Sequence, residues 1–228
     1  MSADFNEYKD TYKREVDKSI RFSGQPVEFF TEIKAKIILE SAKRLNGDIT
    51  RLEVLDLGCG NGLTDMFLVN EFQILSGIDV ASEAVEKAKV LNPTVDYKVY
   101  DGSELPFHEN KFDIVFIICV MHHLQIKQRY DFLAETKRVL KEGGLLMIFE
   151  HNPLNYFTRY AVLNCEFDKD ALLITKTELK KLIYGNGFSL VDENYIIFFP
   201  FRGKLFRFIE KGLRRLPLGA QYYLIAQK

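Results

Sequence analysis

The chain has 228 residues, of which 47% are hydrophobic and 28% charged, and its formal net charge is −1. These values are ordinary for a globular protein and exclude a disordered chain, a collagen-like chain and a coiled coil. The balanced charge supplies no global field to attract nucleic acid or an anionic membrane. The length predicts one enlarged domain over residues 1–228.

Nothing in the chain predicts export or a membrane span. The longest apolar run, Ile114–Met121, is far shorter than the roughly 18 residues that a spanning helix requires. The first ten residues are polar and lack the pattern of a secretion signal. The three cysteines are widely spaced and form no CxxC pair, which predicts reduced thiols. We therefore expect a cytoplasmic protein.

Hydrophobic periodicity predicts an α/β fold. A helix is expected over 27–46, within an N-terminal helical cover formed by residues 1–46. Strands are then expected over 53–58, 73–80, 95–100, 112–120, 145–150, 188–199 and 221–227. Helices are expected over 62–70, 81–91, 127–140 and 176–186. This alternation predicts a doubly wound, seven-stranded sheet, mostly parallel with an antiparallel last strand, and with helices on both faces.

Ligands bind such sheets beyond the carboxyl ends of the strands, and the residues at these positions point to an adenosine-containing cofactor. The first strand ends in VLDLGCGNG (54–62), where glycines allow a sharp turn and close approach of a ligand, and the next helix is expected to present free N–H groups. Asp79 follows the second strand, where an acid accepts hydrogen bonds from ribose hydroxyls. Asp101 follows the third strand and suits an adenine amino group.

The glycine spacing separates two classes of nucleotide. A dinucleotide-binding turn reads G-x-G-x-x-G, whereas this turn reads G-x-G-x-G and is preceded by Asp56. A carboxylate at this place favours a cationic ligand over a pyrophosphate, because two anionic groups repel each other.

These motifs resemble those of class I S-adenosylmethionine-dependent methyltransferases, in particular the group that includes ubiquinone- and menaquinone-biosynthesis enzymes. The resemblance covers residues 52–151, including GIDVA (77–81), DGSELPF (101–107), FDIVFIICVMHHL (112–124) and RVLKEGGLLMIFEH (138–151). It implies a Rossmann-like fold and S-adenosylmethionine as the cofactor, with S-adenosylhomocysteine as the product. It also implies these cofactor contacts: Asp56, Gly58, Cys59, Gly60, Asn61, Asp79, Val80, Asp101, Gly102, Ser103 and Cys119, with Tyr12 of the N-terminal stretch folding over the cofactor.

Histidines gather at the same edge of the predicted sheet. His122 and His123 follow the fourth strand, and His151 follows the fifth. They are candidate general bases, and the alternative is that they only pack the turns. No ligand set with spacing such as H-E-x-x-H is present, so no metal is expected and activity is expected to survive a chelator.

Two insertions are expected on the substrate side, over 152–175 and 200–219. The first does not match the quinone enzymes, so the substrate is not inherited from them. It carries a possible short helix over 154–163, and the candidate acceptor contacts are Glu150, Asn152, Asn155, Tyr156, Arg159 and Tyr160. Alternatively, this segment is a lid that only excludes water.

The second insertion contains a basic amphipathic helix over 202–216, with Lys204, Arg207, Lys211, Arg214 and Arg215 on its polar faces. The helix either packs on the sheet or makes a weak contact with a membrane surface near a lipid-linked acceptor. Nucleic acid is not expected as a partner, because neither an added binding domain nor broad positive charge is present.

The predicted function is S-adenosylmethionine-dependent methyl transfer, by in-line displacement, to a small-molecule or lipid-linked metabolite. Two alternatives stay open: a nicotinamide-dependent oxidoreductase on a similar fold, and a non-catalytic cofactor-binding subunit that supports a partner.

Overall fold

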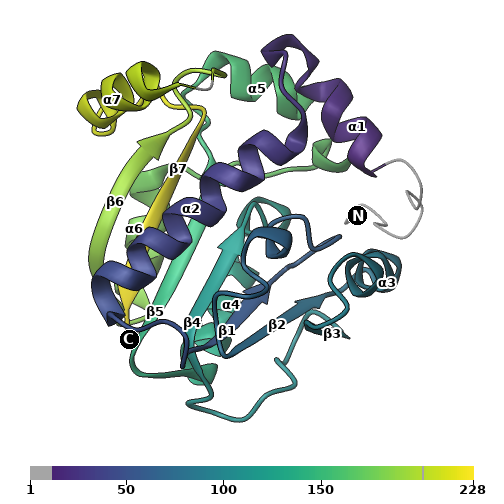
Figure 1. Cartoon of the computed structure of the whole chain (residues 1–228), viewed down its shortest axis with the longest axis vertical. Helices are drawn as coiled ribbons and strands as arrows, with labels where there is room; N and C mark the ends of the chain where they lie inside the picture. Colours follow the sequence, from purple (N-terminus) through teal and green to yellow (C-terminus); the bar gives the residue numbers. More distant parts are fainter. Residues whose placement is uncertain (1–11, 202) are drawn as a thin grey trace.

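A seven-stranded sheet forms the centre of the molecule (Figure 1). The structure, a computed structural model, describes residues 12–201 and 203–228; residues 1–11 and 202 and the side chains of Tyr12, Lys13, Lys204, Leu205 and Arg207 lie outside this description. The strand order is β3-β2-β1-β4-β5-β7-β6. The strands are β1 (Glu53–Leu57), β2 (Ile74–Asp79), β3 (Asp96–Val99), β4 (Phe112–Ile118), β5 (Leu140–His151), β6 (Ser189–Ile196) and β7 (Gln221–Gln227).

The direction of the strands confirms the predicted fold class. Strands β1 to β5 pair in parallel, and β7 lies antiparallel between β5 and β6. The helices are α1 (Tyr12–Ser19), α2 (Val27–Asn46), α3 (Ser82–Leu91), α4 (Gln128–Val139), α5 (Tyr156–Leu163), α6 (Lys176–Gly185) and α7 (Lys204–Leu213).

Helices cover both faces of the sheet because successive strand side chains point to opposite sides. On one face, Ile38 of α2 and Val85 of α3 pack with strand residues such as Phe116, and Figure 1 shows α2 crossing in front of the sheet. On the other face, Leu133 of α4 and Leu179 of α6 belong to a second buried cluster. The two clusters hold the strand ends in fixed positions, which is what a precise binding site needs.

The helices α1, α5 and α7 gather beyond one end of the sheet, at the top of Figure 1. Aromatic rings join segments that are distant in sequence: Phe22 stacks on Phe157 with ring centroids 5.7 Å apart and meets Tyr160 edge-on at the same distance. The expected short helix in the first insertion is confirmed as α5. These helices form the walls of the space above the strand ends.

The prediction of a helix over 62–70 is wrong. That segment contains only a short 3-10 turn, Asp65–Phe67. Nine residues are marginal for a helix, and several of these are poor helix formers. Asp65 is instead drawn into the interior, where it accepts a 2.5 Å hydrogen bond from the hydroxyl of Tyr97. The glycine turn is therefore not followed by a helix that presents free N–H groups.

Within residues 12–201 and 203–228, no helix has the length and apolar character needed to cross a membrane.

Candidate functional site

A cavity of about 1010 Å³ opens beyond the carboxyl ends of the central strands. Its floor is the turns after β1, β2 and β4, and its walls come from α1, α2 and α5. A volume near 1000 Å³ is at the upper end of the range for pockets that hold one drug-sized ligand. The cavity therefore has room for two small molecules side by side.

The turn after β1 needs glycine for two different reasons. At Gly58 the backbone has φ +86°, and a Cβ atom would lie 2.3 Å from Cγ2 of Val120, so the position is both left-handed and tightly packed. Gly60 also has positive φ, but a Cβ there would meet no atom within 4 Å. Gly58 thus fits against Val120 in the turn after β4, whereas Gly60 leaves open space beside the cavity.

Asp79, at the end of β2, ties that strand to the glycine turn. Its carboxylate accepts hydrogen bonds from the backbone N–H of Gly60 at 2.8 Å and of Ala81 at 2.9 Å. Burial raises the pKa of Asp79, and these donors partly oppose that shift. A carboxylate has about four acceptor positions, so Asp79 can still accept bonds from a ligand in the cavity.

Asp56, at the end of β1, is a buried acid that lies beside a second buried acid, Asp65. Burial raises its pKa well above the usual range, and the nearby charge of Asp65 raises it further. Its Oδ1 atom makes no hydrogen bond to the part of the chain that the structure describes. A cationic group in the cavity would supply what this carboxyl is missing.

The other predicted cofactor contacts lie around the same end of the cavity. Asp101 is exposed, and Oδ1 accepts bonds from the backbone N–H and hydroxyl of Ser103, which lower the pKa of Asp101. Ser103 is absent from the described lining and supports Asp101 from outside. The lining includes Cys59, Asn61, Val80, Gly102 and Cys119. Tyr12 begins α1, and later residues of that helix line the cavity.

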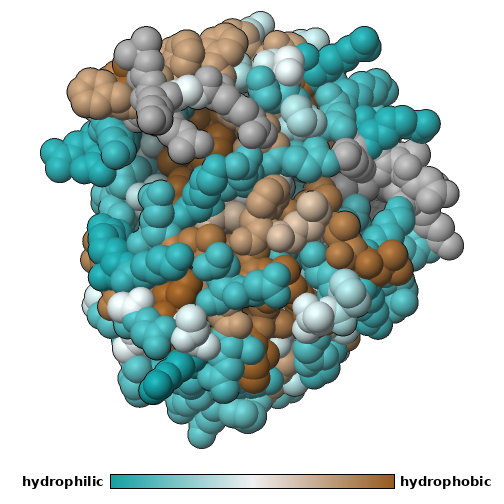
Figure 2. All heavy atoms as spheres, viewed as in Figure 1, coloured by the Kyte–Doolittle hydropathy of each residue, from teal (hydrophilic) through white to brown (hydrophobic). Residues whose placement is uncertain are grey.

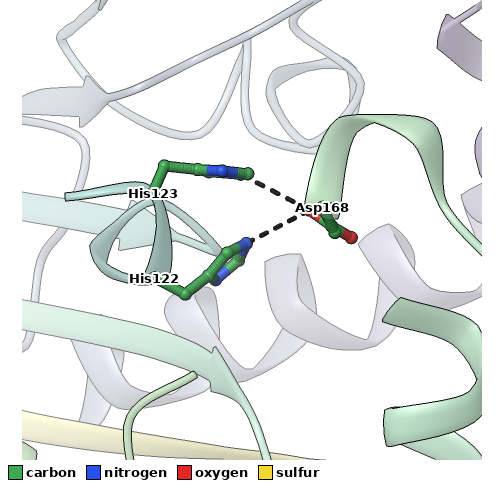
Figure 3. A group of neighbouring side chains, drawn as sticks. All are labelled: His122, His123 and Asp168. Atoms are coloured by element: carbon green, nitrogen blue, oxygen red, sulfur yellow. Dashed lines mark ion pairs between the residues drawn. The ribbon is translucent and has the colours of Figure 1, made fainter. Parts of the chain in front are cut away.

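His122 and His123 meet Asp168 at the opposite end of the cavity (Figure 3). Nε2 of His122 lies 3.4 Å from Oδ1 of Asp168, and Nε2 of His123 lies 3.5 Å from the same atom. Nδ1 of His122 lies 2.7 Å from Oε2 of Glu150. Burial alone would lower the pKa of His122, but Glu150 and Asp168 outweigh it and raise that pKa well above its usual value.

The other two cavity histidines are uncharged at neutral pH. Burial lowers the pKa of His123 to about 4, and the positive charge of His122 acts in the same direction. Burial lowers the pKa of His151 to about 4 as well, again with His122 opposing protonation. One charged and two neutral imidazoles therefore face the same space.

Gln221 orients His151. Nζ of Lys34 lies 3.5 Å from Oε1 of Gln221, and because lysine only donates, this contact directs the Gln221 amide nitrogen toward Nδ1 of His151, 3.3 Å away. Nδ1 therefore accepts, and the neutral ring carries its proton on Nε2. His151 is set to donate a hydrogen bond rather than to accept a proton.

The predicted acceptor contacts fall into three groups. Asn155 lines the cavity and caps α5, its side chain accepting from the N–H of Thr158 at 2.9 Å. Glu150 and Asn152 are buried and hold protein groups: Glu150 accepts from the N–H of Met121, and Asn152 donates to the carbonyl of Gly219. The described lining also lacks Tyr156, Arg159 and Tyr160, which point outward on α5.

Sequence reasoning missed Lys34, Phe157, Asp168 and Gln221, which all line the cavity. None belongs to a motif, and they come from four separate segments. The sequence pointed to Asp168 only through its location in the first insertion, which does not match the quinone enzymes.

The chain is similar to known methyltransferases. Residues 55–148 match the family described as "Methyltransferase domain". An uncharacterized methyltransferase of Synechocystis is 29% identical over 62% of this chain and 69% of its own length. A ubiquinone biosynthesis O-methyltransferase of Bartonella bacilliformis is 27% identical over 65% of this chain and 64% of its own.

A solved structure from Thermotoga maritima, a SAM-dependent methyltransferase described as a possible histamine N-methyltransferase, covers 100% of both chains with a TM-score of 0.68 and 19% identity. That likeness is one of fold. Residues 55–148 therefore form a methyltransferase domain, and the fold and the ordered motifs around the cavity are those of class I S-adenosylmethionine-dependent methyltransferases.

Proposed function

We propose that the chain methylates a small-molecule acceptor that binds between the cofactor and the histidines. The observation that supports this proposal is the two-ended cavity, which joins the glycine turn to the group of His122, His123, His151 and Asp168. Apolar residues form much of the wall of this cavity, among them Phe132, Phe157, Val162 and Phe167. Such a wall suits an acceptor with an apolar body and one polar group that receives the methyl.

In this proposal the cofactor occupies the end of the cavity that carries Asp56, Asp79 and Asp101, which we call the cofactor end. Asp56 lies near the methionine ammonium group, Asp79 accepts from the ribose hydroxyls, and Asp101, supported by Ser103, accepts from the adenine amino group. Gly58, Cys59, Gly60, Asn61, Val80, Gly102 and Cys119 contact the cofactor from the turns. The buried, unpartnered oxygen of Asp56 supports this orientation, because the ammonium would satisfy it.

Methyl transfer then needs positioning more than charge stabilisation. A lone pair of the acceptor forms the new bond to the methyl carbon, the S–CH₃ bond breaks, and its electron pair stays on sulfur as neutral S-adenosylhomocysteine. Holding the two reactants in line contributes about 7–11 kcal/mol. An acceptor O–H or N–H passes its proton to water in the cavity, and His151 donates a hydrogen bond to the same group.

The proposal is tested with purified protein and methyl-labelled S-adenosylmethionine. Calorimetry should detect binding of S-adenosylmethionine and no binding of NAD⁺ or NADP⁺. Incubation with the small-molecule fraction of a cell extract should yield a labelled product by mass spectrometry. Binding of a nicotinamide cofactor alone would favour the oxidoreductase alternative. Label found only in the macromolecular fraction would contradict the proposed acceptor class.

A lipid-linked acceptor is a second candidate, supported by the exposed surface around α5 and α7. None of the described side chains of α7 is buried, and Phe208 is 76% exposed. The neighbouring exposed apolar residues are Leu154, Tyr156, Phe157, Tyr160, Leu163, Ile209, Leu216 and Leu218. Figure 2 shows hydrophobic atoms at the top of the molecule, over these helices. Lys211, Arg214 and Arg215 are exposed beside them, a combination that suits an anionic membrane surface.

A further inference from the structure

We propose that His122, His123 and Asp168 bind a divalent transition-metal ion. These residues lie at the end of the cavity where the methyl acceptor is proposed to bind, which we call the acceptor end. The site itself follows from the geometry of these three side chains, and only its part in catalysis rests on the proposed methyl transfer. Figure 3 shows both imidazole rings directed at the Asp168 carboxylate, the histidines from the turn after β4 and the aspartate from the first insertion. The three ligand atoms lie within 4.8 Å of one another.

The distances fit a metal better than hydrogen bonds. In a tetrahedral site with bonds of about 2.0–2.1 Å, neighbouring ligand atoms are roughly 3.3–3.4 Å apart. The two Nε2–Oδ1 distances are 3.4 and 3.5 Å. An N–H···O hydrogen bond is most often about 2.9–3.0 Å long. The two histidine–aspartate distances are therefore those of neighbouring ligands around an ion, and the remaining pair, the two histidine nitrogens, lies within 4.8 Å.

Glu150 supplies the outer support that metal-binding histidines usually have. Its Oε2 atom lies 2.7 Å from Nδ1 of His122, and its Oε1 atom accepts a bond from the N–H of Met121 at 2.8 Å. A carboxylate on one ring nitrogen fixes the ring and leaves the other nitrogen for the ion. Nε2 of His122 is buried and makes no hydrogen bond to the described residues. The ion would replace the proton that otherwise lies between this nitrogen and Asp168.

The ligand set leaves a position for a substrate. All three residues line the cavity, and two histidines with one carboxylate are the pattern of catalytic rather than structural zinc sites, which keep a coordination position open. An acceptor hydroxyl bound there would lose its proton more easily to water, and its oxygen would be held for attack on the methyl group. This inference departs from the sequence expectation of no metal, because the aspartate lies far along the chain from the histidine pair.

The experiment measures metal binding directly. Tag-free protein is stripped with a chelator and titrated with Zn²⁺ by calorimetry, and separately with Co²⁺, whose visible absorption reports tetrahedral coordination. The variants are Asp168→Asn and His123→Ala, which each remove one ligand, and Glu150→Gln, which alters the outer support. His108→Ala is the matched control, because His108 is exposed and lies outside the cavity lining.

We expect about one ion per chain in the wild type and in His108→Ala. Glu150→Gln should weaken binding by about 10- to 100-fold, the usual effect of an outer-shell change, and the ligand variants should weaken it by more. Equal Zn²⁺ affinity in wild type, Asp168→Asn and His123→Ala would overturn the proposal, as would no stoichiometric binding in the wild type. Circular dichroism identifies any variant that fails to fold, and the other ligand variant then decides.

Titration with S-adenosylmethionine in the absence of metal separates this proposal from the proposed function. Cofactor binding without metal binding would overturn the metal site and leave the methyltransferase proposal intact. Metal binding without cofactor binding would overturn the methyltransferase proposal and leave the metal site intact.

Discussion

The two ends of the cavity are built in different ways. The proposed cofactor end consists of backbone turns after consecutive strands, from Gly58 to Gly102, with Asp79 held by backbone N–H groups. The acceptor end consists of side chains from distant segments, including Lys34, His122, Asp168 and Gln221. The family match covers residues 55–148, and thus spans the first end and only part of the second. A shared reaction and an individual substrate can therefore coexist in one cavity.

The strongest test of this comparison is a pair of glycine substitutions. Gly58→Ala should lower the free energy of unfolding by about 2–4 kcal/mol, because it combines a left-handed backbone with a 2.3 Å contact to Val120. Gly212→Ala, in α7, meets no atom within 4 Å and should raise that free energy by up to about 1 kcal/mol. Urea unfolding measures both. Equal midpoints for the two variants would show that the cofactor turn is no more constrained than the outer helix.

The next effect is on cofactor affinity. Asp79→Asn removes a charged acceptor and should weaken S-adenosylmethionine binding by about 1.5–3 kcal/mol, or roughly 10- to 150-fold. The matched control is Asp96→Asn, because Asp96 is exposed at the start of β3 and pairs with Lys98 on the surface. Calorimetry compares the two variants. A folded Asp79→Asn protein with wild-type affinity would remove this residue from the proposed cofactor site.

A smaller effect is expected on proton linkage. The raised pKa of Asp56 means that the free protein holds this carboxyl protonated at pH values where an exposed aspartate is ionised. Binding of a cationic group beside it should favour the carboxylate, release up to one proton and strengthen as the pH rises. Calorimetry at one pH in two buffers with different ionisation enthalpies measures the proton count.

The control for this linkage is Asp101, an exposed acid with a lowered pKa. Asp56→Asn should abolish the proton release, whereas Asp101→Asn should leave it in place. The same binding enthalpy in both buffers for the wild type would mean that no group near the cofactor changes its protonation.

The smallest effect on stability is expected outside the cavity. Reversing two exposed charges in Lys211→Glu/Arg215→Glu should change the free energy of unfolding by no more than about 0.5 kcal/mol. If α7 faces an anionic membrane, each basic residue contributes about 1 kcal/mol to attachment, and the double variant should no longer sediment with anionic vesicles at low salt. Failure of the wild type itself to sediment would leave the small-molecule acceptor as the better candidate.

The sequence by itself determined the sheet and predicted the proposed cofactor contacts. Strand periodicity predicted seven strands, and turns at consecutive strand ends placed Asp56, Asp79 and Asp101 at one edge, because parallel strands all end on the same side. Even there, short-range patterns were insufficient where a buried contact outweighed local preference. The helix expected over 62–70 gave way to the bond between Asp65 and Tyr97.

Only the tertiary structure decided what the histidines face. Nothing in the spacing of residues 122, 151, 168 and 221 relates them to one another, and their meeting depends on how the first insertion folds back over β4 and how β7 inserts beside β5. The tertiary structure also places Glu150 and Asn152 in the interior, where they form hydrogen bonds with buried backbone groups. Local sequence patterns report backbone geometry within a few residues, whereas charge pairing and burial depend on segments that meet only in the folded chain.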